Sequence, residues 1–518
     1  MLKAITVSNL RSFREPTRFE IAPITVFIGQ NSAGKSSITR LFPLMKQSVE
    51  QLGASTVLWN SLYVDYGSIE EVISHDADEK NLTFTFELDP QTISLYISRQ
   101  RTGRIQPLPA FESVSYQVVL ARAPKGRTRV VSSQIVIDRD IISFLYGNNG
   151  KMTGVTINDL PISELRSDIK FEAQTRPLIQ RVDFGDFSRS YISPSEEHPF
   201  VRALGELLAE PLGYLPKAKI FARLGRELFY DPAQDFKSHL ESLLNSYDSE
   251  RRFRLDQIDD AIIEQARLLV VARTIPLIVD SIFYSLNADA RLSKYVGPIR
   301  ASAERYYRIQ ELTIDSIDPR GENLAMYLHF LSPAHLRGFN EIFFDAFGYV
   351  IEPSADRGHV SLLLKEQKKS GGENIADVGF GFSQVLPVVA QVYSALAQQD
   401  IAVRRGTAGL VSTNPIVAIE QPELHLHPAY QARLGDLFSS LVYKDTGNRG
   451  FRFVIETHSE AFVNRLGELI SQGKLAPEKA IIYTFEKDAQ SHNTIVKELK
   501  FNPDGTIENW PSGFFTTF

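Results

Sequence analysis

The segment that decides the fold is residues 415–428, PIVAIEQPELHLHP, an apolar run that stops abruptly at an acid. An uninterrupted apolar run of this kind is typical of a strand buried on both faces of a parallel sheet. Such a strand carries the acid, Glu420, to the carboxyl edge of the sheet, where α/β folds bind their ligands. The next residue is Gln421, whose amide cannot accept a proton as a carboxylate can. The segment therefore predicts an α/β fold with a functional site at this edge.

The composition is that of a soluble, globular protein. The chain has 518 residues, of which 43% are hydrophobic and 23% are charged. This length is too great for one compact core, so we expect two or three packed units. There is no unbroken apolar run of about 18 residues, and the first residues alternate like a strand, so the sequence predicts neither a transmembrane helix nor a signal peptide.

The sequence lacks cysteine, which excludes disulfides, thiolate catalysis and cysteine-based metal centres and favours a cytoplasmic location. The formal net charge of −6 gives no general attraction to DNA, so a nucleic-acid contact would need a local basic patch. One candidate patch consists of Arg122, Lys125, Arg127 and Arg129. Both a solvated charged turn and a nucleic-acid contact are compatible with it.

A second strand is predicted at residues 24–28, and it runs into the glycine loop GQNSAGKSS at residues 29–37. The loop matches the P-loop pattern GxxxxGK[ST] between a strand and a helix, in which backbone N–H groups and the helix N-terminus face a phosphate. Lys35 is expected to reach the β- and γ-phosphates, and the Ser36 hydroxyl to bind Mg²⁺. The residues predicted to bind the nucleotide here are Gly29, Asn31, Ser32, Ala33, Gly34, Lys35, Ser36 and Ser37.

The rest of the chain divides into regions of different pattern. The helix after the glycine loop has an apolar stripe, and Pro43 is expected to kink or end it. Short alternating runs between residues 81 and 162 predict antiparallel strands, and helical spacing of apolar residues follows. We therefore expect an N-terminal ATPase lobe with the P-loop at 1–80, an antiparallel β-subdomain at 81–198, a helical insertion at 199–296 and a C-terminal ATPase lobe at 297–518.

Residues 377–384, DVGFGFSQ, precede an apolar helix. Gly381, Ser383 and Gln384 would lie at the N-terminus of that helix, which is a second position suited to a phosphate. Glycine and serine also cap helices that bind nothing, so the segment is a weak signal when taken alone. Its position between the P-loop and Glu420 in the chain strengthens it.

A further apolar run at residues 451–455 ends just before His458. A lone histidine is usually structural or solvated. Here the residue follows a predicted buried strand and precedes a helix, so we expect its imidazole at the same sheet edge as Lys35 and Glu420. At that place the imidazole could respond to a γ-phosphate.

Together these motifs resemble the ATP-binding-cassette type of ATPase, in the soluble branch that includes the chromosome-structure and DNA-repair ATPases. More closely, they are similar to stand-alone bacterial anti-phage defence ATPases of the Septu and overcoming-lysogenization-defect type. The motifs that carry this resemblance are EQPELHLHP at 420–428, GPIR at 297–300, IETHSE at 455–460 and WPSGFF at 510–515. It covers residues 1–66 and 297–518, and implies a P-loop, ATP-binding-cassette-type α/β domain carrying a β-subdomain and a helical insertion.

The resemblance also implies roles for the site residues. The Ser36 hydroxyl would bind Mg²⁺, the Glu420 carboxylate would hold the ion directly or through a water molecule, and His458 would sense the γ-phosphate. The signature residues Gly381, Ser383 and Gln384 would cover the nucleotide bound to the opposite subunit, so a complete ATP site would need two chains. This predicts a homodimer or a dimer-based higher oligomer, with residues 424–428 as the loop that crosses the interface.

Two departures from the family pattern affect the expected mechanism. Gln421 stands where these ATPases usually carry the general base, so the catalytic set becomes Glu420, Gln421, Glu423 and His458. Glutamine can orient a water molecule, as it does in some GTPases, with Glu423 or His458 helping, or it can leave the ATP-bound dimer long-lived; we expect slow hydrolysis. The chain after His458 is also too short for the fused nuclease domain of the lysogenization-defect proteins.

The leading hypothesis is a dimeric ATP-driven switch that controls a separately encoded effector nuclease. In Septu-type systems that companion is a small His-Asn-His endonuclease, and some related systems also bind a retron's RNA–DNA hybrid. The alternative is a DNA-repair or chromosome-maintenance ATPase that acts directly on DNA. A transporter subunit is disfavoured by the β-subdomain and by the lack of a clear glutamine loop between Lys35 and Gly67.

Overall fold

The computed structural model describes residues 1–51, 55–75, 79–100, 110–165, 172–174, 181–183, 199–213, 224, 228, 230–232, 235–247, 252–310, 316–366, 371–404, 414–442, 450–491 and 493–510. Contacts divide the chain into two compact units. Unit 1 comprises Met1–Val7, Gly53–Val57 and Glu79–Asn287, and unit 2 comprises Ser8–Leu52, Leu58–Asp78 and Ala288–Phe518. Unit 2 therefore combines segments from both ends of the chain.

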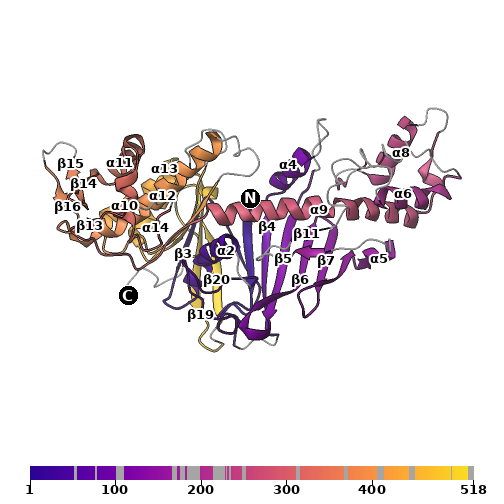
Figure 1. Ribbon diagram of the computed structural model, residues 1–518, viewed down its shortest axis with the longest axis horizontal. Coiled ribbons are helices and arrows are strands. Elements are labelled where there is room, and N and C mark those ends of the chain that lie inside the picture. Colours follow the sequence, from indigo (N-terminus) through magenta and orange to yellow (C-terminus); the bar gives the residue numbers. More distant parts are fainter. Residues whose placement is uncertain are drawn as a thin grey trace. The chain divides into compact units, whose positions relative to one another are not determined.

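Unit 2 is built on a central sheet with the strand order β12-β17-β18-β3-β19-β20. Strands β3, β19 and β20 of this sheet are labelled in Figure 1. Strands β12, β17, β18, β3 and β19 are parallel, and β20 is antiparallel to β19. The strands are β3 (Ile24–Gly29), β12 (Lys294–Val296), β17 (Ile416–Glu420), β18 (Arg452–Glu456), β19 (Ala480–Lys487) and β20 (Thr494–Lys500). A parallel sheet of α/β type is what the sequence predicts, and it is the fold of the P-loop nucleotide-binding domains.

The central strands are buried on both faces, as their uninterrupted apolar runs require. On one face, alternate residues of β3, including Val26 and Ile28, join a core that contains apolar side chains of the surrounding helices. On the other face Phe27 packs against the aromatic rings of Tyr483 and Phe485. These two cores fix the strand ends, and so the edge that carries the site.

The helices of unit 2 are α1 (Lys35–Thr39), α2 (Leu41–Glu50), α3 (Ile69–Val72), α10 (Leu324–Phe330), α11 (Pro333–Phe347), α12 (Gly379–Arg404), α13 (Pro428–Val442) and α14 (Glu460–Ser471). A smaller antiparallel sheet consists of β13 (Tyr307–Arg308), β14 (Tyr349–Asp356), β15 (His359–Glu366) and β16 (Glu373–Asn374). Strand β2 spans Thr17–Glu20. Residues 511–515 of the predicted WPSGFF motif lie outside the described residues.

The helix break expected near Pro43 is present. The helix after the P-loop divides at Arg40, between α1 and α2, and Pro43 is the third residue of α2. Thr39, the last residue of α1, is four residues before Pro43, and a proline ring clashes with the backbone carbonyl at that position.

Unit 1 is organised around a sheet that includes β1-β4-β5-β6-β7-β8-β9 in this order. The strands from β4 to β9 are antiparallel, which bears out the strands expected from the alternating runs. Its strands are β1 (Leu2–Ser8), β4 (Asn81–Leu88), β5 (Val114–Arg122), β6 (Thr128–Ile137), β7 (Asp140–Tyr146), β8 (Met152–Ile157) and β9 (Leu160–Pro161), with the separate pair β10 (Glu172–Gln174) and β11 (Arg181–Asp183). Its helices are α4 (Pro90–Gln100), α5 (Ile162–Leu165), α6 (Pro199–Ala209), α8 (Phe236–Tyr247) and most of α9 (Asp260–Leu292). Helix α4 interrupts the β-region and was not predicted.

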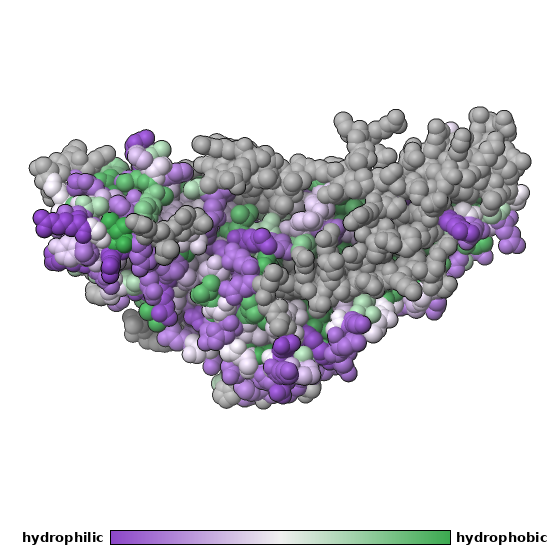
Figure 2. All heavy atoms as spheres, viewed as in Figure 1, coloured by the Kyte–Doolittle hydropathy of each residue, from purple (hydrophilic) through white to green (hydrophobic). Residues whose placement is uncertain are grey.

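Helix α9 crosses the sheet of unit 1. The amino group of Met1, before β1, donates a hydrogen bond to Ser285 Oγ (2.8 Å), and Arg267 of the same helix contacts Asp140 at the start of β7. In the part of the chain that the structure describes, α9 is the one helix long and apolar enough to cross a membrane, but 83% of its apolar window is buried inside the protein. Over the described part of the face in Figure 2, hydrophilic and hydrophobic residues are intermixed.

A buried ion pair joins α9 to the sheet. Arg267 donates to both carboxylate oxygens of Asp140 at 2.8 Å, and Tyr230 donates to the same carboxylate at 2.6 Å. Burial opposes ionisation of Asp140, but the hydrogen bonds from Arg267, Tyr230 and Asn158 outweigh it and lower the pKa of that carboxyl. The pair therefore stabilises the folded state only while Asp140 is ionised.

We predict that Arg267→Met lowers the free energy of unfolding by about 3–5 kcal/mol at pH 7, because it leaves the Asp140 carboxylate buried without its cation. Because the folded pKa of Asp140 is depressed, the native pair contributes stability above the unfolded pKa of about 3.9 and loses it as the pH falls through the folded value. Urea unfolding at pH 7 and at acid pH measures both effects.

The matched control is Arg202→Met, since Arg202 pairs with Glu206 on an exposed helix surface, with side chains 68% and 59% exposed. Its effect should be within about 0.5 kcal/mol. Equal losses in the two variants would contradict the role assigned to the buried pair.

Candidate functional site

The P-loop lies between β3 and α1 in a conformation that depends on glycine. Gly29 and Gly34 have φ angles of 147° and 94°. A Cβ atom on Gly29 would lie 2.2 Å from the carbonyl oxygen of Phe485, and one on Gly34 would lie 2.8 Å from the Phe13 ring. Both positions therefore combine a backbone conformation that side chains rarely adopt with a close neighbour. The loop can curve around a phosphate because these side chains are absent.

The loop is anchored to the neighbouring strands. The backbone N–H of Gln30 donates to the Phe485 carbonyl at 3.1 Å, and the Thr494 hydroxyl donates to the Ala33 carbonyl at 2.9 Å. Asn31 and Ser32, at the tip, are exposed. The loop is thus held at its base while its tip stays open to solvent.

The side chain of Lys35 folds back onto the P-loop. Lys35 Nζ donates hydrogen bonds to the carbonyls of Gly29 and Gln30, both at 2.8 Å. Burial lowers the pKa of Lys35, and the nearby carboxylates of Glu456 and Glu423 partly oppose that shift. A bound phosphate can replace these carbonyls as the partner of the ammonium group.

Ser36 and Ser37, the next residues of α1, have different surroundings. Ser36 donates its hydroxyl hydrogen bond to Glu456 Oε1 at 3.0 Å. Ser37 is buried, and its hydroxyl accepts a hydrogen bond from Arg11 at 3.3 Å. Ser36 therefore faces the sheet edge, whereas Ser37 serves the packing of α1.

Glu420 ends β17, as predicted, and its carboxylate is fully engaged within the chain. Arg40 donates to both of its oxygens at 2.7 and 2.8 Å, and the Tyr295 hydroxyl donates at 2.6 Å. The hydrogen bond to Glu420 raises the pKa of Arg40 above its ordinary value. The buried acid is thus neutralised by a bidentate guanidinium.

Glu456 ends the neighbouring strand β18 and is the direct register partner of Glu420. Its Oε2 atom is buried without a hydrogen-bond partner. Burial, and next the negative charge of Glu420, raise the pKa of Glu456 to about 7. Its position after an apolar run is the same sequence signal that identifies Glu420, but no role was predicted for Glu456.

Gln421 follows Glu420 in a strained turn. Its φ is 47°, and its backbone N–H donates to the Glu456 carbonyl at 2.7 Å. Arg300 of the GPIR motif donates to the carbonyls of Glu420 and Gln421 at 2.6 and 3.1 Å, while its Nε and Nη1 atoms are buried without partners. Burial lowers the pKa of Arg300 to about 10. These contacts fix the direction in which the Gln421 side chain leaves the sheet edge.

Glu423 and His458 meet at the same edge. The backbone N–H of His458 donates to Glu423 Oε1 at 2.8 Å, and Glu423 Oε2 is buried without a partner. Burial raises the pKa of the Glu423 carboxyl. The His458 side chain is exposed, and its pKa is lowered by partial burial and then by the charge of Lys35. The structure thus brings the four predicted catalytic residues to the edge that holds the P-loop.

The signature residues lie at the start of α12. Ser383 and Gln384 are 7% and 4% exposed, so most of their surface is covered by their own chain. A Cβ atom on Gly381 would lie 3.0 Å from the His425 carbonyl, so this glycine lets α12 approach the 424–428 loop. Their proposed contact with a nucleotide on a second chain stays a prediction.

The residues at the edge fit a magnesium–phosphate complex. Among the described residues no group of three or more histidine or acidic side chains is arranged to hold a metal ion. Mg²⁺ usually binds through one or two protein oxygens together with substrate phosphates. The Ser36 hydroxyl and the buried Oε2 atom of Glu456, which has no hydrogen-bond partner, supply ligands of this kind. When bound, the ion would neutralise charge on the phosphates.

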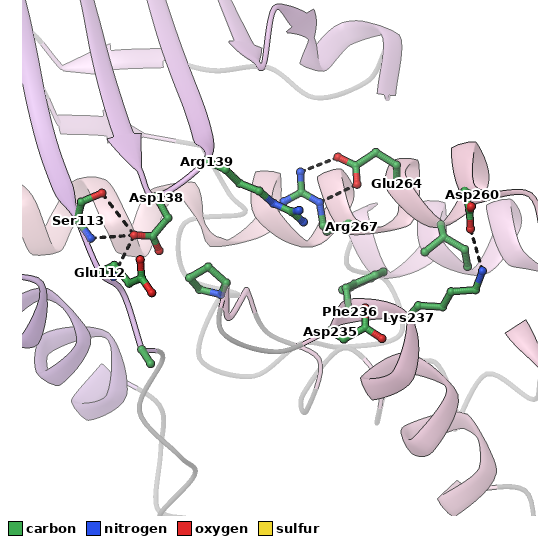
Figure 3. A pocket seen from close by; sticks show the side chains of 13 residues that line it. Glu112, Ser113, Asp138, Arg139, Asp235, Phe236, Lys237, Asp260, Glu264 and Arg267 are labelled. Atoms are coloured by element: carbon green, nitrogen blue, oxygen red, sulfur yellow. Dashed lines mark hydrogen bonds and ion pairs between the residues drawn. The ribbon is translucent and has the colours of Figure 1, made fainter. Parts of the chain in front are cut away.

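A separate cavity of about 790 Å³ lies in unit 1 (Figure 3). Its charges are largely paired within the chain: Asp138 accepts backbone hydrogen bonds from Glu112 and Ser113, and Lys237 pairs with Asp260 at 2.8 Å. We assign no chemistry to this cavity.

Fold and site together define an α/β P-loop nucleotide-binding protein. Residues 1–181 match the family described as "AAA ATPase domain", and residues 226–464 match the family described as "AAA domain, putative AbiEii toxin, Type IV TA system". Both matches are to families of AAA-type ATPase domains, and they support nucleotide binding and ATPase activity in general.

The comparison with curated protein sequences gives no match. Among solved structures the chain is similar to an Smc head bound to the C-terminal winged-helix domain of ScpA, at 11% identity and a TM-score of 0.35, covering 96% of this chain and 97% of the other. It is also similar to an Smc head domain with an extended coiled coil bound to the C-terminal domain of ScpA, derived from Pyrococcus furiosus, at 12% identity and a TM-score of 0.36, with 96% of each chain covered.

We predict that Gly29→Ala abolishes nucleotide binding and strongly destabilises unit 2, because its Cβ atom would meet a backbone oxygen that cannot move away. Binding of a fluorescent ATP analogue and thermal unfolding measure the two effects. Gly473→Ala is the control, since Gly473 also has a positive φ of 67° but open space around its Cβ position. Backbone strain alone should cost that variant about 1–3 kcal/mol and leave binding intact. Equal effects on binding would contradict the close-contact argument.

Proposed function

We propose that this chain is the ATP-binding, slowly hydrolysing subunit of a dimeric switch in bacterial anti-phage defence, and that it controls a separately encoded effector nuclease. The P-loop geometry supports binding of the nucleotide phosphates. The Ser36 hydroxyl and the acids beside it support a role for Mg²⁺. The motifs shared with Septu-type ATPases support the defence role.

The observation that carries the proposal is Gln421 in the place of the general base. Its amide cannot accept a proton from water. Glu420, the adjacent acid, is held by Arg40 and Tyr295. Glu423 keeps a buried oxygen without a hydrogen-bond partner and has a raised pKa, so it is a candidate substitute base. Such a site would hydrolyse ATP slowly once it is bound. Binding of ATP, rather than rapid turnover, would then carry the signal.

The nucleotide also links two chains in this proposal. Lys35 exchanges the loop carbonyls for phosphate oxygens, and His458, at the same edge, lies close enough to Lys35 for the two charges to interact. Gly381 and Ser383 of a second chain complete the site. The ATP-bound dimer would hold the effector, a small His-Asn-His endonuclease, and hydrolysis would release it. An RNA–DNA hybrid of the retron type is a further candidate partner.

A direct DNA-acting ATPase is the second candidate. It is favoured by the β5–β6 hairpin, where Arg122, Lys125 and Arg127 are exposed and Arg129 is half-buried. A protein that uses this patch on DNA would show DNA-stimulated hydrolysis and an affinity that falls steeply with salt concentration.

We predict that Gln421→Glu increases the single-turnover rate of ATP hydrolysis by tenfold or more, because a carboxylate restores a proton acceptor worth about 10²–10⁴ in favourable sites. Rapid-quench measurement with excess protein separates this step from product release. Gln421→Asn, which keeps the amide, is the control and should remain slow. An unchanged rate in Gln421→Glu would show that Gln421 is not what limits hydrolysis.

We predict that the chain, expressed with the genes that flank it in its source genome, protects cells from phage and co-purifies with a nuclease. Lys35→Ala should abolish both ATP binding and protection, since it removes the cation that meets the phosphates. Lys474→Ala, a substitution on an exposed turn, should change neither. Protection that survives Lys35→Ala would contradict the switch, and DNA-stimulated turnover without a nuclease partner would favour the second candidate.

A further inference from the structure

Two acids, Glu420 and Glu456, are candidates for the magnesium ligand at the edge of the unit 2 sheet. Glu420 and Glu456 end adjacent parallel strands in direct register, so the chain positions both near the end of the P-loop. The resemblance to other ATPases points to Glu420. The contacts of the two side chains, however, are very different.

Both carboxylate oxygens of Glu420 already accept hydrogen bonds. Its Oε1 accepts from Arg40 Nε and the Tyr295 hydroxyl, and its Oε2 accepts from Arg40 Nη2, at 2.6–2.8 Å. Its side chain is 2% exposed. To bind a cation directly, this carboxylate would have to leave a buried bidentate guanidinium, which would then be left without its anion.

Only one of the two carboxylate oxygens of Glu456 accepts a hydrogen bond. Its Oε1 accepts the Ser36 hydroxyl at 3.0 Å, and its Oε2 is buried with no hydrogen-bond partner. A buried carboxylate oxygen without a partner is unfavourable, and a hard cation that prefers oxygen ligands is a fitting partner for it. Ser36 is also the P-loop hydroxyl, so an ion bound to the nucleotide phosphates would lie beside both groups.

We infer that Glu456, and not Glu420, is the carboxylate that binds the magnesium ion with Ser36. Glu420 instead positions Arg40 and Tyr295 and so holds the end of β17. The inference rests on the nucleotide binding proposed above. It assigns the ion to the end of β18, one strand away from the acid that the sequence pattern selects.

The test is the effect of the metal on nucleotide affinity, measured by calorimetry with a non-hydrolysable ATP analogue in EDTA and in Mg²⁺. In EDTA, Glu456→Gln should bind the analogue at least as tightly as the native chain does, because the substitution removes a negative charge beside the phosphates. In Mg²⁺ the native chain should gain affinity, and Glu456→Gln should lose at least tenfold of that gain. Glu460→Gln, the same change at an exposed acid four residues on, should keep the full gain.

Electron paramagnetic resonance with Mn²⁺ and the same analogue provides a direct count of bound metal. The native chain should bind one ion per nucleotide, and Glu456→Gln should lose it at metal concentrations that saturate the native chain. Glu456→Asp keeps the charge but shortens the side chain, so it should show an intermediate metal affinity. This variant gives the answer if Glu456→Gln does not fold.

The outcomes separate the two proposals. Full metal gain in both Glu456 variants, with loss in Glu420→Gln, would overturn the assignment and leave ATP binding intact. Failure of the native chain to bind the analogue, with or without metal, would overturn the proposed function itself.

Discussion

The parallel register of β3, β18 and β17 is the constraint on which the site depends. It pairs Glu456 with Phe27 on one side and with Glu420 on the other. Because the three strands end at the same edge, the P-loop that follows β3 and the two acids must lie together. Two neighbouring carboxylates in a buried edge are costly to ionise, so their partners decide what each can do.

Those partners divide the two acids. Arg40, the residue at which the first helix divides, neutralises Glu420, and the Tyr295 hydroxyl donates a further hydrogen bond to it. Glu456 has one hydroxyl partner and a pKa raised to about 7 by burial and by the charge of Glu420. Glu420 thus stabilises the structure of the edge, whereas Glu456 can still bind a cation.

The turn after Glu420 links structure to the proposed slow switch. Gln421 is held in a left-handed conformation by its own backbone hydrogen bond to the Glu456 carbonyl and by Arg300 on the carbonyl side. The same edge carries Glu423 and His458, joined through a backbone hydrogen bond. In the proposed dimer, this hydrogen bond would connect the nucleotide site with the turn that leads into the 424–428 loop.

The sequence by itself determined the α/β fold of unit 2, the antiparallel strands of unit 1 and the residues at the nucleotide edge, because apolar runs, alternation and the P-loop pattern are local signals. It anticipated the helix break near Pro43 but gave no sign of α4. Only the tertiary structure decided how the acids differ. Glu420 and Glu456 are alike in sequence, each ending a buried strand, but the free energy of a buried carboxylate depends on the groups that surround it. Arg40 and Tyr295 are 380 and 125 residues away from Glu420 in the chain, and no local pattern could have revealed that they would meet it.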